Sequence, residues 1–369
     1  MNVKVNTCTL LLLSAALLAA CSGHSNNTTG DNSDSAYPPW SPINIACLYC
    51  LTDIPVGTLV PAHLGPDNLW DRPDLQTQVN QHFNFVIPGY IMSHEIIHPE
   101  ENRFNFYESD MLLDYAQSNG QSFNGGHLVW HYQIPDWMQN YTGNWSAMMA
   151  NHIQTIVSRY TGQAASWIVV NEAFDDNNPT NLRNTLWRQN VGDDYIAQAF
   201  IAARAADANV DLYYNDYMVF AQFKRNAVLA MVDDFQNRGI PIDGLGIQMH
   251  IDINWPSIEE IRTMLDDVVD TGLKIRFTEL DITINRDQLY SNITLDLALR
   301  QEQRYREVVA AYMEHVPPAQ RGGIVVWGVS DADSSARNDY LQLDWPLLFD
   351  EYFNQKPALR GFAAGLASQ

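Results

Sequence analysis

Short apolar runs alternate with longer amphipathic stretches from about residue 54 to the end of the chain. Short runs bounded by turn residues predict buried strands, and apolar positions that recur every three or four residues predict helices. The predicted strands are Ile54–Val60, Phe83–Pro88, His127–His131, Trp167–Asn171, Asp211–Tyr214, Leu245–Met249, Lys274–Thr278 and Ile324–Trp327. The predicted helices are Asp71–Gln81, Glu108–Asn119, Ser146–Tyr160, Asp194–Ala206, Gln222–Arg238, Ser257–Asp270 and Asp296–His315, with another near the C-terminus.

This alternation of strands and helices determines the fold class. Strands separated by helices favour a parallel sheet, and eight such units are the number that closes a (β/α)8 barrel. A chain of 369 residues is long enough for one such barrel with additions. Because no linker-like stretch interrupts the pattern, we expect a single α/β domain, a (β/α)8 TIM barrel, over residues 40–369.

Two predicted strands end on carboxylates. The apolar strand in the sequence WIVVNEAF ends on Asn171 and Glu172, and the strand in IRFTELDITI carries Glu279 with Asp281 two residues later. Each Glu on its own fits a structural role, paired with a buried Arg or a backbone amide. Two carboxylates at strand ends, far apart in sequence, fit the pair that glycoside hydrolysis requires.

The other polar and aromatic candidates also follow strands. In TIM barrels the active site lies at the C-terminal ends of the strands, so these residues are expected on one rim. They are Trp130, His131 and Gln133 after the third strand, Asn215, Asp216 and Tyr217 after the fifth, Gln248 and His250 at the sixth, and Trp327 and Asp331 after the eighth.

The charge and composition of the chain limit the classes of ligand that it can bind. The formal net charge of −22 argues against nucleic acid and against anionic membrane surfaces, whose phosphates the protein would repel. A neutral ligand is the expected partner, and an anionic polysaccharide requires a local basic patch. The 10 Trp and 17 Tyr residues suit sugar stacking and a large core equally.

The first residues are typical of an export signal. Lys4 precedes a short apolar run, and the sequence Leu18-Ala19-Ala20-Cys21 resembles a bacterial lipobox, in which the cysteine is lipidated. An ordinary cleaved signal peptide is the alternative. We expect a signal over residues 1–20, a polar tether over 21–39, and an exported bacterial lipoprotein. Ser22, in place of the aspartate of inner-membrane retention, favours the outer membrane, with the periplasmic or cell-surface face left open.

The remaining cysteines favour a disulfide. Cys8 leaves with the signal and Cys21 carries lipid, so Cys47 and Cys50 remain of the four. The sequence offers no second Cys pair or nearby set of His residues for a metal, and an exported location favours a small disulfide loop. We therefore expect no metal and no cofactor, and a monomeric protein.

Seven segments, in order, resemble glycoside hydrolase family 10, the retaining β-1,4-xylanases. They are LVWHYQIPDW (Leu128–Trp137), WIVVNEAF (Trp167–Phe174), YYNDY (Tyr213–Tyr217), IDGLGIQMHI (Ile242–Ile251), FTELDI (Phe277–Ile282), VVWGVSDADS (Val325–Ser334) and LLFDEYFNQKPA (Leu347–Ala358). The resemblance covers residues 54–360 and implies that Glu172 is the general acid/base and Glu279 the nucleophile.

The resemblance also implies roles around the two carboxylates. Asn171 would bind the sugar 2-hydroxyl, and His250, with Asp281 behind it, would orient the nucleophile. Gln248, Gln133, Trp130 and Trp327 resemble the walls of the −1 site, and Tyr217 resembles a stacking residue on the aglycone side. A core histidine is the alternative for His250. Taken alone, Trp130 and Trp327 are more typical of a core than of a sugar platform, and only their place on the rim favours sugar binding.

The departures from the family cluster on the glycone side. Where the family has Glu-Asn-x-Met-Lys after the second strand, this chain has Gly89, Tyr90, Met92 and Ser93. The family histidine before Trp130 aligns with Gly126, and His127 is one residue out of step, which on a strand turns a side chain to the other face. Ser335 replaces a tryptophan and Met218 an asparagine.

Three hypotheses follow. The first is a retaining endo-β-1,4-xylanase. The second keeps this chemistry on a substituted, mixed-linkage or other β-linked polysaccharide, since Gly89 and Gly126 would leave room for a bulkier unit. The third is a lipid-anchored glycan-binding protein without catalysis. The presence of Glu172 and Glu279 together counts against the third hypothesis, because a pure binding protein needs no such pair.

Overall fold

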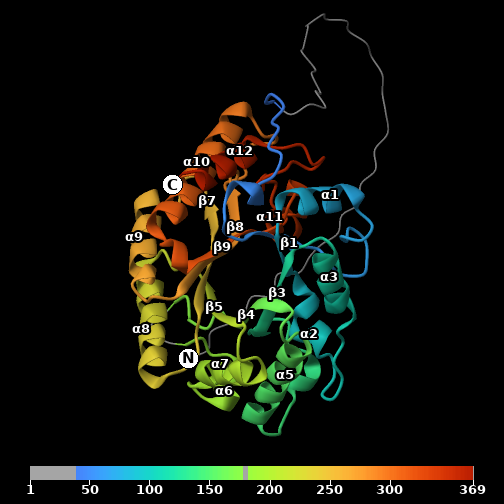
Figure 1. Ribbon diagram of the computed structural model, residues 1–369, viewed down its shortest axis with the longest axis vertical. Helices are drawn as coiled ribbons and strands as arrows, with labels where there is room; N and C mark the ends of the chain where they lie inside the picture. The colour runs from blue at the N-terminus through green and yellow to red at the C-terminus, as the bar shows by residue number, and fades with distance from the viewer. Residues whose placement is uncertain (1–38, 178–181, 369) are drawn as a thin grey trace, which may run out of the picture. The chain divides into compact units, whose positions relative to one another are not determined.

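The structure is a computed structural model that describes residues 39–177 and 182–368 (Figure 1). The predicted signal, Cys21 and residues 21–38 of the predicted tether lie outside these ranges. Within them, no helix has both the length and the apolar character needed to cross a membrane.

The described strands form a closed parallel barrel. The barrel strands are β1 (Val56–Val60), β2 (Phe85–Pro88), β3 (Ser122–Val129), β4 (Ala164–Asn171), β5 (Asp211–Tyr217), β6 (Gly244–Gln248), β8 (Lys274–Thr283) and β9 (Arg321–Val326). Neighbours along the chain pair in turn, β6 pairs with β8, and β9 pairs with β1, so the sheet closes on itself. The short β7 (His250–Asp252) follows β6 after Met249 and pairs in parallel with the C-terminal part of β8. The predicted (β/α)8 barrel is confirmed.

Helices surround the barrel, as the ribbon shows (Figure 1). The longer ones are α1 (Pro73–His82), α3 (Tyr107–Ser118), α5 (Trp145–Arg159), α7 (Tyr195–Ala206), α8 (Gln222–Arg238), α9 (Ile258–Val269), α10 (Leu295–His315) and α12 (Pro357–Leu366). Short helices α2 (His94–Ile97), α4 (Asp136–Gln139), α6 (Leu186–Val191) and α11 (Ser335–Asn338) lie in the connecting segments, as do 3-10 turns at Tyr49–Leu51, Tyr90–Met92, Pro318–Gln320 and Asp331–Asp333.

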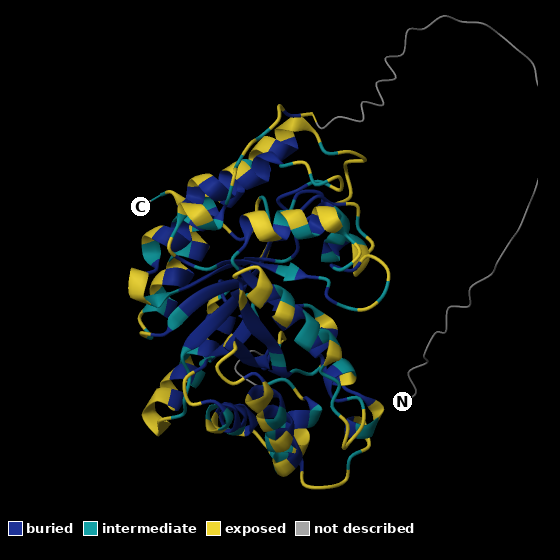
Figure 2. Ribbon diagram, turned by 45° about the vertical axis from the view of Figure 1, so that its right-hand side comes forward, coloured by how far each residue is buried: buried dark blue, intermediate teal, exposed yellow. Residues whose placement is uncertain are grey.

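Helix α9 shows how the sequence specifies this outer layer. Ser257 and Glu260 form a reciprocal capping box at its start, which satisfies backbone donors that the first turn leaves unpaired. Its buried residues, Ile261, Met264, Leu265 and Val268, recur at helical spacing and face the barrel. Figure 2 shows the same division in most helices, with buried inner faces and exposed outer faces around buried strands.

The third strand lies earlier in the chain than predicted, at Ser122–Val129 and not His127–His131. Asn124 and two glycines conceal it, because they break the apolar pattern. Asn124 is nevertheless buried, since its side chain contacts Ser166 and accepts a hydrogen bond from Arg276 inside the barrel. Gly125 is required for packing, because a Cβ there would lie 2.0 Å from the Trp167 ring.

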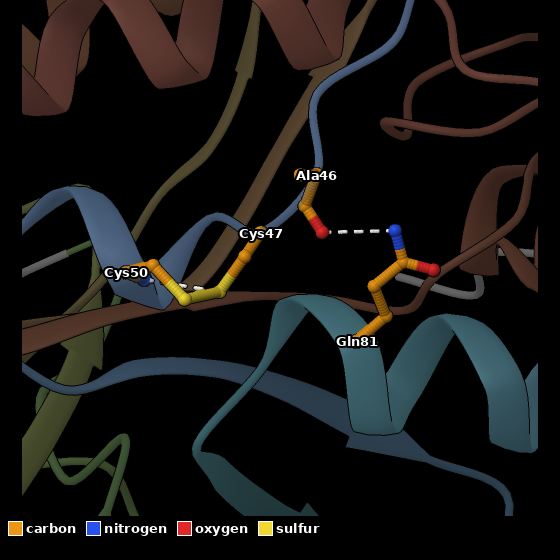
Figure 3. The surroundings of a disulfide bond; sticks show 4 residues. All are labelled: Ala46, Cys47, Cys50 and Gln81. Atoms are coloured by element: carbon orange, nitrogen blue, oxygen red, sulfur yellow. Dashed lines mark hydrogen bonds between the residues drawn. A yellow bond between two sulfur atoms is a disulfide. The ribbon is translucent and has the colours of Figure 1, made fainter.

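Cys47 and Cys50 form a disulfide with an S–S distance of 2.03 Å (Figure 3). The loop lies against α1, where the Gln81 side chain donates a hydrogen bond of 2.8 Å to the carbonyl of Ala46. The disulfide loop therefore belongs to the surface that covers α1, on the outside of the barrel.

Candidate active site

Glu172 directly follows β4 in a strained backbone conformation. Its φ of 55° lies in the left-handed region, which residues with a Cβ adopt rarely. Its backbone N–H donates to the Asn215 carbonyl at 2.9 Å, which ties this turn to β5. The side chain is buried, and its Oε1 accepts hydrogen bonds from Asn171 at 2.9 Å and Gln248 at 3.0 Å. The carboxylate is thus fixed by two amides.

Glu279 lies inside β8 and is also buried. Its Oε1 accepts a hydrogen bond from Asn215 Nδ2 at 2.8 Å, and its Oε2 lies 3.1 Å from His250 Nε2. Both oxygens therefore have partners from other strands, Asn215 on β5 and His250 on β7, which holds the carboxylate in one orientation.

Two amide side chains connect the carboxylates. Asn215 Nδ2 donates to Asn171 Oδ1 at 2.8 Å as well as to Glu279, and Asn171 in turn donates to Glu172. Thr278 donates to Asn215 Oδ1 at 2.7 Å, which fixes the direction of that amide. Gly246 makes room for this arrangement, because a Cβ there would lie 2.4 Å from Asn215 Oδ1. The two glutamates therefore belong to one hydrogen-bonded unit.

The surroundings of Glu172 favour its protonated form. Burial raises the pKa of Glu172, the Gln248 hydrogen bond lowers it in part, and the negative charge of Glu279 raises it further. A carboxyl group with a raised pKa can carry a proton at a pH where an ordinary glutamate is ionised. The environment thus suits Glu172 to proton donation.

His250 links Glu279 to Asp281. Its Nδ1 lies 2.9 Å from Asp281 Oδ2, and its Nε2 faces Glu279. Burial acts to lower the pKa of His250, but the two carboxylates outweigh this effect and raise it well above its ordinary value. About a third of the side chain, 36%, is exposed to solvent, which weakens the desolvation but leaves the direction unchanged. In its cationic form His250 donates to both carboxylates and so orients Glu279.

A dense ionic cluster lies beside Glu172 at the end of β5. The Tyr217 hydroxyl donates to Asp176 at 2.5 Å and accepts from Arg183 at 2.9 Å, and Arg183 also donates to the Glu172 carbonyl at 3.2 Å. The fully buried Lys224 contacts Asp176 at 3.2 Å and lies 4.4 Å from the Tyr217 ring centroid. Lys224 thus makes a cation–π contact with one face of the Tyr217 ring.

Asp216 is the buried anion of this cluster. It pairs with Lys224 at 3.0 Å and accepts from the Tyr214 hydroxyl at 2.6 Å, and burial raises its pKa to about 6. Asp331, predicted on the rim, occupies a similar environment elsewhere: it is buried against Lys356 at 2.8 Å, and burial raises its pKa to about 6. Asp331 is therefore part of an internal ion pair.

The sequence interpretation did not single out four contributors to this site, namely Arg183, Asp176, Lys224 and Thr278. Three of them lie in a loop or on α8, where no periodic pattern distinguishes them. Thr278 directly precedes Glu279, which was a usable signal. The sequence predicts Asn215 on the rim, but its bridging position between Asn171 and Glu279 depends on how β4, β5 and β8 are arranged in space.

The aromatic candidates line the same rim. Trp327 lies nearly perpendicular to His250, with ring centroids 5.9 Å apart, and Trp130 follows β3, where its carbonyl accepts a hydrogen bond from the Trp187 indole at 2.8 Å. Both are half-buried, which leaves part of each ring accessible. Gln133 follows on the same segment with a φ of 53°.

His127 faces the site, contrary to the expectation that a shift of one residue turns it away. The pairing of β3 with β4 is irregular between Gly125 and His127, and such a bulge resets the alternation of side chains. The His127 ring lies 5.0 Å from that of Trp130. Burial lowers the pKa of His127, and the nearby Glu279 charge acts in the opposite direction.

Gly126 does not leave open space, which corrects the second expectation on this side. A Cβ at Gly126 would lie 3.0 Å from the Met92 Cβ, so the Met92 side chain fills that position. At Gly89 a Cβ would make only ordinary contacts, the nearest at 3.6 Å. Tyr90 is 48% exposed, and its ring lies 5.5 Å from that of His63. The glycone side, where the chain departs from the family pattern, thus carries apolar and aromatic groups.

Within the described residues, no group of three or more His, Cys, Asp or Glu side chains is arranged to hold a metal ion.

The chain is similar to two curated xylanases of Cellvibrio japonicus. It is 42% identical over 341 residues to endo-beta-1,4-xylanase Xyn10C, covering 85% of this chain and 56% of that protein. It is 38% identical over 348 residues to endo-1,4-beta-xylanase A of strain Ueda107, covering 87% of this chain and 57% of that protein. The chain thus spans just over half the length of these relatives.

The fold is similar to that of solved structures. A mutant of xylanase 10C from Cellvibrio japonicus in complex with xylopentaose superimposes with a TM-score of 0.84 at 40% identity, covering 88% of this chain and 70% of that one. The profile of glycosyl hydrolase family 10 matches residues 54–364. Because this match spans most of the chain and agrees with the barrel and its paired glutamates, the chain belongs to glycosyl hydrolase family 10.

Proposed function

We propose that the protein is a retaining endo-β-1,4-xylanase in which Glu172 is the general acid/base and Glu279 the nucleophile. The observation that carries the proposal is the pair of buried glutamates at the ends of two barrel strands, joined through Asn171 and Asn215. Their environments differ as this chemistry requires, because burial raises the pKa of Glu172 and a cationic His250 faces Glu279. The similarity to two xylanases supports xylan as the substrate.

In the first step Glu279 attacks the anomeric carbon while Glu172 protonates the leaving oxygen. The glycosyl–enzyme ester that forms removes the negative charge of Glu279. Since that charge is one cause of the raised pKa of Glu172, the pKa falls, and Glu172 can then accept a proton from the attacking water. The same residue serves as acid and then as base.

The test uses the protein with unsubstituted β-1,4-xylan. We expect internal cleavage to a mixture of short oligosaccharides, identified by mass, and a β-configured product before mutarotation, followed by NMR. Retention requires carboxyl groups about 5–5.5 Å apart. An α-configured first product would contradict the role of Glu279, and the absence of cleavage would contradict the proposed substrate.

We also propose that Cys21 is lipidated and anchors the protein to the outer membrane of a bacterium, with the barrel acting as a monomer. The support is the sequence from Leu18 to Cys21. Replacement of Cys21 by Ala should move the protein from the detergent phase to the aqueous phase in a Triton X-114 partition. Equal partition of both forms would contradict the anchor. The molar mass of the protein in solution, measured by light scattering, tests whether it is a monomer.

A further inference from the structure

A hollow lies next to the short strand that carries His250. This cavity of about 270 Å³, here called the loop pocket, lies between the segment that follows β7 and the segment that follows β8. Its lining includes Asp252, Trp255, Arg286, Asp287, Tyr290 and Arg300. Nothing in the proposed catalytic steps involves these residues.

The loop pocket continues the rim that holds Glu279. His250 and Asp252 lie on the same short strand, with their partners Asp281 and Thr283 on β8. Side chains two residues apart in a strand point to the same face, and their Cα atoms lie about 7 Å apart. A substrate chain bound across Glu279 therefore passes close to the mouth of the loop pocket.

Trp255 offers a fixed aromatic surface in the loop pocket. The residue is 38% exposed, and its ring packs perpendicular to that of Phe220, with ring centroids 4.8 Å apart. Phe220 follows Tyr217 by three residues, so the pocket lies on the same flank as the ionic cluster beside Glu172. Tyr290 is 40% exposed in the same wall. An exposed indole held by a neighbour is suited to stacking on a sugar ring.

Two arginines add positive charge to this surface. The Arg286 side chain is 65% exposed, its Nη1 lies 3.5 Å from Asp252, and its guanidinium lies 6.0 Å from the Trp255 ring. Arg300 is exposed and donates to the neutral side chain of Asn254 at 3.1 Å. Each guanidinium thus retains exposed donors, and the planar donor set of arginine matches a carboxylate.

The acidic residues of the loop pocket do not cancel this preference. Asp252 uses its Oδ1 to accept backbone hydrogen bonds from Asn254 at 2.6 Å and Trp255 at 2.8 Å, so its charge is partly satisfied by the turn. Asp287 is exposed to solvent at the margin. In a chain of net charge −22, an acidic polysaccharide is repelled overall and needs such a local site.

We propose that the loop pocket binds a uronic acid unit, a sugar that bears a carboxylate, attached to the β-1,4-linked chain in the active site. The ring stacks on Trp255, and Arg286 and Arg300 bind the carboxylate. This inference rests on the proposed function and specifies it further: the protein prefers acidic, uronate-decorated xylan to the same polymer without charge.

The test compares a uronate-decorated xylan with the same polymer after chemical reduction of its carboxyl groups to alcohols. We expect kcat/KM of the unaltered protein to be about tenfold higher on the acidic polymer, the size of one charge-assisted hydrogen bond. In the double variant Arg286→Gln and Arg300→Gln this ratio should fall to about one. The matched control, Arg103→Gln with Arg262→Gln, removes the same charge from two exposed arginines on other parts of the surface and should keep the ratio.

A binding measurement tests the uronate site independently of turnover. In a Glu279→Ala background, calorimetry with a uronate-bearing oligosaccharide and its reduced counterpart should give the same preference, lost with the two Gln substitutions and weakened by salt. Equal affinities, or a preference that survives the double variant, would overturn the loop pocket as a uronate site. Failure of the unaltered protein to cleave the reduced polymer would instead contradict the proposed function.

Discussion

The two halves of the barrel rim differ in how their polar groups are satisfied. On the half formed by β4, β5 and β8, Glu172 and Glu279 share a continuous set of amide and imidazole hydrogen bonds. On the half formed by β2 and β3, the positions that carry Glu, Asn and Lys in the family hold Gly89, Tyr90 and Ser93, and Met92 fills the space beside Gly126.

The difference separates catalysis from substrate binding. The half with the glutamates keeps every group that double displacement needs, and each group is fixed by a neighbour on another strand. The other half lacks the hydrogen-bond donors and the charge of the family pattern, and the Met92 side chain lies where a Cβ at Gly126 would be. The groups assigned to the proposed chemistry therefore lie together on one half of the rim, while the glycone half offers a substrate fewer polar groups than the family pattern.

The largest effect is expected from the nucleophile. Glu279→Ala should lower kcat by a factor on the order of 10⁴ or more on xylan and on activated aryl glycosides alike, because no other group can form the covalent intermediate. Steady-state kinetics on both substrates give the test. Glu259→Ala, a change of the same type on the exposed start of α9, serves as the control. Substantial residual turnover on the aryl glycoside would remove Glu279 from this role.

Glu172→Ala should have a smaller effect that depends on the substrate. On xylan, loss of general acid catalysis should cost roughly 10²- to 10⁴-fold in kcat. An aryl glycoside with a good leaving group needs little protonation, so formation of the glycosyl–enzyme should be spared. Added azide can then take the place of water and should raise turnover. If both substrates lose activity equally, Glu172 is not the acid.

The sequence predicted the chemical half of this comparison well and the binding half less well. Strand ends can be read from a sequence because apolar runs stop abruptly, and this placed Glu172, Glu279 and His250 on one rim. The third strand was placed too late because Asn124 and Gly125 break the apolar pattern, although the buried partners Ser166 and Trp167 require them.

Errors on the glycone side have a common physical cause. The interpretation of His127 assumed a regular alternation of side chains along β3, and a bulge breaks that alternation. The space expected at Gly126 is taken by Met92, which lies 34 positions earlier in the chain. Contacts between residues this far apart depend on the register of β2 and β3, which local patterns do not reveal.

Restoring the family's polar residues on the glycone side should improve substrate binding by that half of the rim. The triple variant Gly89→Glu, Tyr90→Asn and Ser93→Lys introduces groups that can bind sugar hydroxyls, each charge-assisted bond being worth about 1.5–3 kcal/mol. Because part of that energy supports distortion of the −1 sugar, kcat as well as KM should improve on plain xylooligosaccharides, with a gain in kcat/KM of about 10- to 100-fold.

Gly126→His should add nothing to this gain, since its Cβ would contact Met92. Xylooligosaccharides of increasing length, compared between the original protein and the triple variant, show where the energy is gained. A triple variant that folds, as judged by circular dichroism, and still cleaves no faster would mean that His63, Tyr90 and His127 already provide an equivalent glycone site.

The smallest change concerns the pH dependence of the catalytic half. Gln248 Nε2 donates to Glu172, which stabilises the ionised carboxylate and lowers its pKa against the larger effect of burial. Gln248→Leu removes this donor, so the pKa of Glu172 should rise. The alkaline limb of kcat/KM marks loss of the proton from the general acid, and it should therefore move to higher pH even though the value at the optimum falls.

Gln133→Leu is the matched control for this shift: it removes an amide from the same rim and should lower kcat/KM without moving the alkaline limb. A limb that stays in place in Gln248→Leu, or moves equally in both variants, would show that another group controls it and that the amides of the catalytic half only position the carboxylates.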